Sequence, residues 1–263
     1  MTLAPFGRRL LRVAGNEKLG AYNLIWVADP DGPADPDPGQ FYMLAAERDW
    51  GGEDGRPYLP RAFSFARVNE HALAFLLEAI GPGTERLARL EQGDGVWVTG
   101  PLGIGFSPPQ RGRALLVGGG IGAAPLLCWR DTLGPETTTL LGFRSAGHAE
   151  AVRYFQGAQV ATDDGSVGHH GFVTELLREE LDSDPEATIY ACGPPPMLEA
   201  VRALAAEREV PAQLAMESGM ACGFGACMGC VVQTKNGYVR LCVDGPVVDA
   251  AELESAWVPG APH

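Results

Sequence analysis

The sequence predicts a multi-domain chain: an antiparallel β domain, an α/β domain on a parallel sheet, and a small cysteine-rich domain. Short strand-like segments separated by turns fill residues 1–108, strands alternate with helices over residues 109–216, and four of the six cysteines lie in residues 217–263. A chain of 263 residues is long enough for about two domains with a small appendage.

The composition is that of a folded globular protein, with 46% hydrophobic and 20% charged residues. A net charge of −13 without a concentrated basic segment argues against nucleic-acid binding. The uncharged stretch at residues 114–129 has 16 residues broken by glycines and a proline, which is too short to span a membrane. The amino terminus lacks an apolar run before a cleavage site, so we expect a cytoplasmic protein whose cysteines serve metal or redox chemistry.

In the first domain, regularly spaced short strands suggest a barrel or a sandwich. The strands are expected at 10–14, 21–28, 40–45, 62–68, 72–79 and 95–99. Residues 29–39 and 50–60 are rich in Gly and Pro, which cannot continue a strand ladder, so loops are expected there. A single short helix is expected over residues 84–90.

In the second domain, the alternation of strands with helices implies a parallel sheet covered by helices. Strands are expected at 114–117, 138–143, 158–162, 188–192 and 213–216, and helices at 123–133, 173–181 and 195–208. Beyond Met216 come glycines, cysteines and a hairpin signal, with Asn236 and Gly237 as its two-residue turn.

The sharpest chemical signal is the cysteine set Cys222, Cys227, Cys230 and Cys242, spaced CxxxxCxxC with 11 residues before the fourth. This spacing is typical of a plant-type [2Fe–2S] cluster, in which three thiolates come from one loop and the fourth from a separate segment. Glycines in the loop permit unusual backbone angles and let backbone N–H groups approach the sulfurs. The alternative is a structural zinc site, but zinc modules usually contain two CxxC pairs and this segment contains one.

A glycine-rich turn joins the first strand and first helix of the α/β domain. Gly118, Gly120 and Ala123 form a GxGxxA pattern, which permits a tight turn and close approach of a pyrophosphate at the helix start. Such turns also occur with a purely structural role. The acidic residue expected about 20 positions further on is missing, because the second strand ends at Phe143 and Arg144, so the choice between NAD and NADP stays open.

The segment Arg61, Ala62, Phe63 and Ser64 is a second candidate for ligand binding. Alternation along a strand places Arg61 and Phe63 on one face and Ser64 on the other. An arginine fork suits a diphosphate, an aromatic ring suits stacking on a flat heterocycle, and a hydroxyl can bond a ring nitrogen. The alternative is an edge strand with one exposed arginine. The turn at residues 81–84 precedes a helix and offers a second anion-binding position.

Seven segments, taken in order along the chain, resemble the electron transfer subunits of class B dihydroorotate dehydrogenase, a family within the ferredoxin reductase superfamily. They are RAFS at 61, GPGT at 81, GPLGIGF at 100, VGGGIGAAP at 117, ATDDGSVGHHGFVTELL at 161, YACGPPPML at 190 and MACGFGACMGCVV at 220. The resemblance implies an FAD-binding β-barrel at 1–108, an NAD-binding α/β domain at 109–216 and a [2Fe–2S] domain at 217–263.

The resemblance also implies which residues hold the cofactors. FAD is expected on Arg61, Ala62, Phe63, Ser64, Leu76, Leu77, Glu78, Gly83 and Thr84. NAD, as co-substrate, is expected on Gly118, Gly120, Gly122, Cys192, Gly193 and Pro194. Two residues depart from the superfamily pattern. Phe63 stands where Tyr is frequent, and Glu78 stands where a basic or neutral residue is expected, so its carboxylate either points away from the FAD diphosphate or only its backbone makes contact.

The implied function is electron transfer in pyrimidine biosynthesis. The resemblance implies that dihydroorotate is oxidised at an FMN in a separate catalytic subunit, and that electrons pass through the cluster and FAD of this chain to NAD. The expected partner is that dihydroorotate dehydrogenase catalytic subunit, in a heterotetramer of two plus two. No catalytic side chain beyond the redox cofactors is expected, because no nucleophile or base constellation lies outside the redox motifs.

Two alternatives remain open at this point. The first is a related FAD and [2Fe–2S] reductase subunit of a ferredoxin:NADP oxidoreductase or sulfide dehydrogenase complex. The second is a non-catalytic, zinc-stabilised interaction module with a reductase-like fold, which would be colourless. The role of Cys192 also has two alternatives, since a cysteine at a strand end can line a nicotinamide pocket or serve as a small buried hydrophobe.

Overall fold

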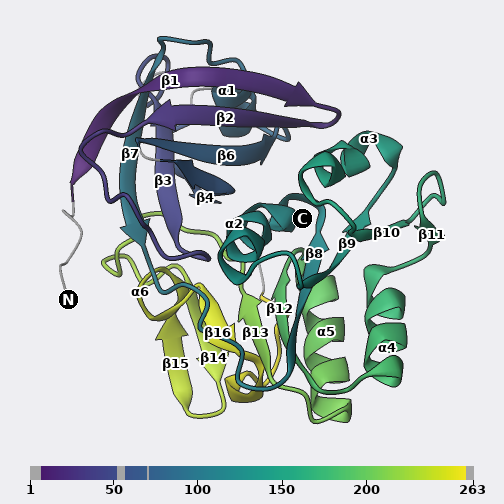
Figure 1. The fold of residues 1–263 in the computed structure, drawn as a ribbon. Helices are drawn as coiled ribbons and strands as arrows, with labels where there is room; N and C mark the ends of the chain where they lie inside the picture. The colour runs from purple at the N-terminus through teal and green to yellow at the C-terminus, as the bar shows by residue number, and fades with distance from the viewer. Residues whose placement is uncertain (1–6, 52–56, 70, 259–263) are drawn as a thin grey trace.

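The computed structural model of the chain describes residues 7–51, 57–69 and 71–258. Its first half forms a seven-stranded antiparallel sheet, here the first sheet, in the order β4-β3-β7-β1-β2-β6-β5. The strands are β1 (Arg8–Leu19), β2 (Tyr22–Ala28), β3 (Phe41–Ala46), β4 (Arg61–Ser64), β5 (Arg67–Asn69), β6 (Ala72–Glu78) and β7 (Gly95–Leu102). A short helix, α1 (Pro82–Ala88), follows β6. Figure 1 shows the sheet curving around its own core in the upper part of the molecule.

The strand predicted at 62–68 is wrong, because the structure has two strands there. β4 and β5 are separated by Phe65 and Ala66, which are both buried. The backbone N–H of Ala66 donates to the carbonyl of Ala74 at 2.7 Å, so the chain keeps a sheet hydrogen bond while it bends. The bend turns the large Phe65 ring into the core of the first sheet, where burial of its apolar surface stabilises the fold.

The second half contains a seven-stranded sheet, here the second sheet, in the order β11-β10-β9-β8-β12-β13-β16. All of its pairs are parallel except β13 with β16. The strands are β8 (Arg113–Gly119), β9 (Thr138–Phe143), β10 (Gln159–Thr162), β11 (His169–His170), β12 (Ala187–Cys192), β13 (Ala212–Ala215) and β16 (Val247–Asp249). The helices are α2 (Ala123–Leu133), α3 (Ala146–Ala149), α4 (Val173–Ser183) and α5 (Pro195–Glu207).

Both faces of the second sheet are covered by helices, as alternating strands and helices predict. On β8, Leu115 and Val117 belong to one buried cluster with residues of α4 and α5, whereas Leu116 belongs to another with Leu126 and Trp129 of α2. Figure 1 shows α4 and α5 side by side, away from the first sheet. In the described part of the chain, no helix is both long and apolar enough to cross a bilayer.

The carboxyl-terminal segment adds a hairpin of β14 (Val231–Thr234) and β15 (Gly237–Arg240), the helix α6 (Leu241–Asp244) and the strand β16. The predicted turn is shifted by one residue. Thr234 pairs with Gly237, so the two loop residues are Lys235 and Asn236, and Gly237 with φ +130° begins the returning strand. The sequence did not predict β16, which lies antiparallel to β13 and joins this segment to the second sheet.

Candidate functional site

A cavity of about 820 Å³ lies between the first and second sheets. This volume is within the range of about 300–1,000 Å³ that is usual for ligand sites. On one side it is lined by β4, the end of β6 and the start of α1. On the other side it is lined by the carboxyl ends of β8, β9 and β12, where α/β sheets bind nucleotides. A third side is closed by residues 215–218 and Met220. They precede the segment of Cys222, Cys227 and Cys230, here the cysteine loop.

The strand β4 forms one wall of the cavity. All four of its residues line the cavity, namely Arg61, Ala62, Phe63 and Ser64. Simple alternation would expose only half of them to one ligand. Because β4 is an edge strand, which pairs only with β3 in the described part of the chain, both of its faces can border the cavity. The structure therefore brings together the arginine, the aromatic ring and the hydroxyl that the sequence singled out.

The guanidinium of Arg61 is held against the turn that opens α1. Its Nη1 donates to the carbonyl of Leu59 at 2.6 Å. A Cβ atom added to Gly83 would lie 2.7 Å from Nε of Arg61, so a side chain there would displace the guanidinium. Two separate sequence signals, the RAFS segment and the GPGT turn, thus form a single cationic corner of the cavity.

The end of β6 and the turn that follows it contribute to the same wall of the cavity. Leu76 and Glu78 line the cavity, but Leu77 is fully buried in the core of the first sheet. Since neighbouring residues of a strand face opposite sides, only the backbone of Leu77 is available to a ligand. Thr84 also lines the cavity, and its Oγ1 accepts hydrogen bonds from the N–H groups of Ile80 at 2.9 Å and Gly81 at 3.1 Å, which fixes the turn before α1.

The carboxylate of Glu78 does not point away from the cavity. Its Oε1 lies 3.4 Å from Nε2 of His148 and 3.9 Å from Nη1 of Arg144. Both partners come from the second-sheet side, in α3 and just after β9. Glu78 therefore joins the two sheets across the cavity, and its charge faces two basic groups.

The glycine turn after β8 forms the floor of the cavity. Gly120, with φ +55°, and Gly122 line it, whereas Gly118 is not among the lining residues. A Cβ on Gly118 would lie 2.7 Å from Cδ2 of Leu141, so this glycine is required for close packing of β8. Gly193 has the same role, because a Cβ there would lie 2.9 Å from the backbone N of Gly119.

At the end of β12, Cys192 and Pro194 line the cavity next to Glu217 and Ser218, which follow β13. Burial raises the pKa of the Cys192 thiol well above its ordinary value, with a smaller contribution from the Glu217 charge. Burial also raises the pKa of Glu217 to about 7. The Oγ of Ser218 is buried and has no hydrogen-bond partner among the described residues, so this corner offers a polar group that a ligand can satisfy.

Replacing Glu217 with Gln is expected to stabilise the folded chain above neutral pH. The pKa of the folded group is about 7 against an ordinary value of 4.5, so the free energy of unfolding is highest below about 4.5 and falls as the pH rises to about 7. At pH near 8 the variant should gain at most about 3 kcal/mol, reduced by partial exposure of the side chain. Denaturant unfolding at acidic and alkaline pH measures the difference.

The exposed Glu136 supplies the matched control, because Glu136→Gln should leave the free energy of unfolding unchanged at both pH values. An effect of Glu217→Gln that is the same at acidic and alkaline pH would contradict the burial of this carboxyl group.

The four predicted cluster ligands are brought together as two pairs. The thiols of Cys222 and Cys227 lie close enough to influence each other's titration, and the backbone N–H of Cys242 donates to Sγ of Cys230 at 3.4 Å. Among the described residues, no three His, Cys, Asp or Glu side chains are grouped so that they could hold one metal ion. A single zinc ion needs four ligands around one point, whereas a two-iron cluster is held by four thiolates over two irons, so the pairs fit the cluster better.

Backbone N–H groups of the loop point at the cysteine sulfurs. Gly225 N–H donates to Sγ of Cys242 at 3.1 Å, and Gly229 N–H donates to Sγ of Cys227 at 3.4 Å. Burial raises the pKa of Cys222, but several loop N–H groups outweigh it and bring the pKa down to about 6. These donors favour the thiolate, which is the form that binds iron.

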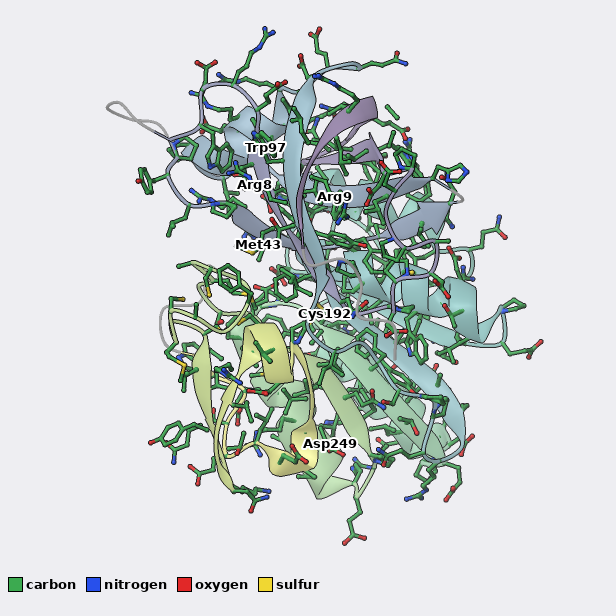
Figure 2. The ribbon with its side chains drawn as sticks, turned by 90° about the vertical axis from the view of Figure 1, so that its left-hand side faces the viewer. Arg8, Arg9, Met43, Trp97, Cys192 and Asp249 are labelled. Carbon is green, nitrogen blue, oxygen red and sulfur yellow. The ribbon has the colours of Figure 1, made fainter. Side chains whose placement is uncertain are left out.

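The cysteine loop rests directly on the first sheet. A Cβ on Gly223 would lie 2.6 Å from Cγ of Met43, a residue of β3. Figure 2 shows Met43 at the end of the first sheet that faces the carboxyl-terminal segment, with Cys192 between the sheets. Met43 and Phe41 share one buried cluster with Cys230 and Cys242.

Some lining residues were missed by the sequence or given no role there. They are Tyr22, Arg144, His148, Phe172, Glu217 and Ser218. Arg144 and Glu217 each lie just beyond the end of a strand of the second sheet, so position at a strand end was a usable signal for both. Nothing in the local sequence places Tyr22 or His148 at a ligand site, because their position depends on contact between the two sheets.

Two family models match parts of the chain. A family model described as the iron–sulfur cluster binding domain of dihydroorotate dehydrogenase B matches residues 217–254, and one described as an oxidoreductase NAD-binding domain matches residues 144–203. The electron transfer subunit of dihydroorotate dehydrogenase B (NAD(+)) from Clostridium acetobutylicum is 37% identical over 82% of this chain and 85% of its own. The subunit of the same name from Bacillus velezensis is 40% identical over 82% and 87%.

Solved structures support the same class. The structure of an NADH-dependent reduced ferredoxin-NADP oxidoreductase, described for flavin-based electron bifurcation, is 27% identical with a TM-score of 0.81, over 95% of this chain and 91% of that chain. The ferredoxin reductase of carbazole 1,9a-dioxygenase is 25% identical with a TM-score of 0.65, over 80% and 67%.

The fold and the matched segments define an NAD-linked oxidoreductase subunit of ferredoxin reductase type with an iron–sulfur cluster binding domain. The resemblance found in the sequence is confirmed at this level. Within that class, the chain belongs to the family of dihydroorotate dehydrogenase B electron transfer subunits.

Proposed function

We propose that this chain takes electrons from the FMN of a dihydroorotate dehydrogenase catalytic subunit and passes them through a [2Fe–2S] cluster and FAD to NAD, in pyrimidine biosynthesis. One observation carries the proposal: the cysteine loop and the cavity share a wall. Phe41 lines the cavity and lies in the same buried cluster as Cys230 and Cys242. A cluster held by these cysteines would therefore adjoin a flavin held in the cavity.

The proposed FAD site uses the first-sheet wall. Arg61 would bind the diphosphate as a two-pronged donor, Phe63 would contact the ring system and Ser64 would bond one of its polar atoms. When bound, FAD supplies the exchange between single electrons and hydride. Gly83 and Thr84 would shape the diphosphate corner, and the further contacts proposed are Ala62, Leu76, the backbone of Leu77 and Glu78.

The proposed NAD site uses the strand ends of the second sheet. Backbone N–H groups of the turn at Gly120 and Gly122 would receive the pyrophosphate, and Gly118 and Gly193 would act by keeping that turn tightly packed. Cys192 and Pro194 would contact the nicotinamide. The thiol of Cys192 stays protonated because burial raises its pKa, so it would serve as a neutral wall of the pocket.

Each of the three proposed domains has its own role. We propose an FAD-binding barrel at 1–108, an NAD-binding domain at 109–216 and a cluster domain at 217–263, with closure of the first sheet into a barrel as part of the proposal. The FMN-containing catalytic subunit as partner and a heterotetramer of two plus two are likewise proposals. A cytoplasmic location stays a prediction.

The test is anaerobic purification with iron, sulfide and flavin quantified, followed by reconstitution with an FMN-containing dihydroorotate dehydrogenase. We expect about two irons, about two sulfides and a flavin per chain. Addition of dihydroorotate and NAD should then produce NADH only when both proteins are present. A colourless preparation that contains zinc, or a preparation loaded with cofactors that does not stimulate NADH formation, would contradict the proposal.

A second candidate is a ferredoxin:NADP oxidoreductase subunit, which the TM-score of 0.81 with a protein of that description favours. The same preparation decides between the two. Reduction of the bound flavin by reduced ferredoxin, together with no response to the dihydroorotate-oxidising partner, would support this second function.

A further inference from the structure

Arg144 stands at a position that selects between the two nicotinamide dinucleotides. It directly follows β9, the second strand of the parallel series, and it lines the cavity. In dinucleotide-binding sheets, an acidic residue near this position bonds the ribose 2′-hydroxyl of NAD, whereas an arginine accommodates the 2′-phosphate of NADP. Yet the relatives from Clostridium acetobutylicum and Bacillus velezensis carry NAD(+) in their names. An arginine alone does not account for that preference.

The order of the strand ends shows where the adenosine half would lie. The cavity runs from Cys192 at the end of β12, past the turn at Gly120 after β8, to Arg144 after β9, and these three strands are neighbours in the sheet. A dinucleotide with its pyrophosphate at the turn and its nicotinamide at Cys192 would place its adenosine over β9. Phe172, which is 66% exposed and lines the same end, offers a ring for the adenine.

Two carboxylates line this end of the cavity: Asp163 follows β10 of the second sheet, and Glu78 comes from the first sheet and faces Arg144. Oε1 of Glu78 lies 3.9 Å from Nη1 of Arg144 and 3.4 Å from Nε2 of His148. His148 is itself held in place, because its Nδ1 lies 3.0 Å from Oγ of Ser145 and its ring makes an edge contact with that of Tyr22. The Glu78 side chain is only 20% exposed, so water screens its charge less than that of a surface carboxylate.

We propose that Glu78 is the specificity residue that favours NAD over NADP, supplying from the first sheet the acidic group that the second strand lacks. This inference rests on the proposed function. The carboxylate occupies the basic pair Arg144 and His148 and would repel a 2′-phosphate, which carries a charge of about −1.5 to −2. A 2′-hydroxyl is uncharged and can donate a hydrogen bond to a carboxylate.

The test is Glu78→Gln in the FAD-loaded full chain, with ferricyanide as electron acceptor. The ratio of kcat/KM for NADPH to that for NADH should rise on the order of tenfold. Because this is a ratio on the same enzyme, partial loss of FAD cancels. The double variant Glu78→Gln with Arg144→Ala should lose most of the gain, since the freed guanidinium is its main source and only the removal of the Glu78 charge remains.

Ligand binding gives a readout that does not depend on turnover. Calorimetric titration of the same proteins should show Glu78→Gln binding adenosine 2′,5′-bisphosphate more tightly than the unsubstituted chain, with little change for adenosine 5′-monophosphate. Glu17→Gln is the matched control. Glu17 is a carboxylate of β1 that pairs with Arg153 from the second-sheet side, but it does not line the cavity.

The outcomes are distinguishable. If the unsubstituted chain contains FAD and oxidises NADH, and the ratio and the affinity for the bisphosphate are the same in Glu78→Gln, the role of Glu78 is overturned and the proposed function stands. An equal shift of the ratio in Glu17→Gln would overturn the role of Glu78 in the same way. If the unsubstituted FAD-loaded chain does not oxidise NADH, the proposed function itself is overturned.

Discussion

Replacing Cys227 with Ser is expected to remove the iron–sulfur cluster and to stop electron transfer from the partner to NAD. Cys227 is the most exposed of the four ligands, and its thiol pairs with that of Cys222. Loss of one thiolate leaves one iron with an incomplete set of ligands, so NADH formation driven by dihydroorotate should fall by at least about 100-fold. Oxidation of NADH with ferricyanide should stay close to the unsubstituted level, because the cavity contains none of the loop cysteines.

Iron and sulfide analysis of the purified variant, together with both activities, measures this result. Cys128→Ala is the matched control. Cys128 is buried in α2, where burial raises the pKa of its thiol to about 12, and it lies far along the chain from the loop. The control should keep its iron. Retention of iron by Cys227→Ser, or loss of the ferricyanide activity in a folded variant, would show that this cysteine has a different role.

The features that could be predicted from sequence are those decided by short segments. The cysteine spacing predicts the loop because the thiols must reach one cluster, and the structure pairs Cys222 with Cys227 and Cys230 with Cys242. The glycine turn after β8 was predicted in place, with α2 beginning at Ala123. The alternating strands and helices predicted the parallel pairs of the second sheet because each element carries its own periodicity.

The features that could not be predicted depend on contacts between distant segments. β16 is three residues long and pairs with β13 only because the carboxyl-terminal segment folds back, so no local pattern indicates it. In the sequence, the negative charge of Glu78 conflicts with the diphosphate site expected beside it. Its partners Arg144 and His148 lie more than sixty residues away in the sequence and become its neighbours only when the two sheets meet.

Strand geometry explains the remaining differences. Because side chains alternate along a strand, Leu76 and Glu78 face the cavity whereas Leu77 faces the core of the first sheet. A family pattern that groups the three residues as ligand contacts does not distinguish the two faces. The opposite holds for β4, where alternation would hide part of the segment but the edge position exposes all of it to the cavity. A sequence motif thus identifies the strand, and the position of that strand in the sheet decides which of its atoms a ligand can reach.

Arg61→Ala is expected to weaken FAD binding about 10- to 100-fold, because a charged, two-pronged donor to a diphosphate contributes about 1.5–3 kcal/mol. The guanidinium is already oriented by the Leu59 carbonyl and by close contact with Gly83, so little ordering is required when the ligand binds. Flavin absorbance retained after dialysis, and titration of the stripped protein with FAD, measure the effect.

Two further variants test whether the loss of FAD affinity comes from the two-pronged geometry of the guanidinium. Arg61→Lys keeps the charge but loses the fork, so its affinity for FAD should fall between those of Ala and Arg. Arg89→Ala should leave affinity unchanged, since Arg89 is 81% exposed just after α1 and does not line the cavity. Equal affinity in Arg61→Ala and the unsubstituted chain would place the diphosphate elsewhere in the cavity. If Arg61→Lys binds FAD as tightly as the unsubstituted chain, the contact depends on charge alone. The close fit of the guanidinium against Gly83 would then contribute nothing to FAD affinity.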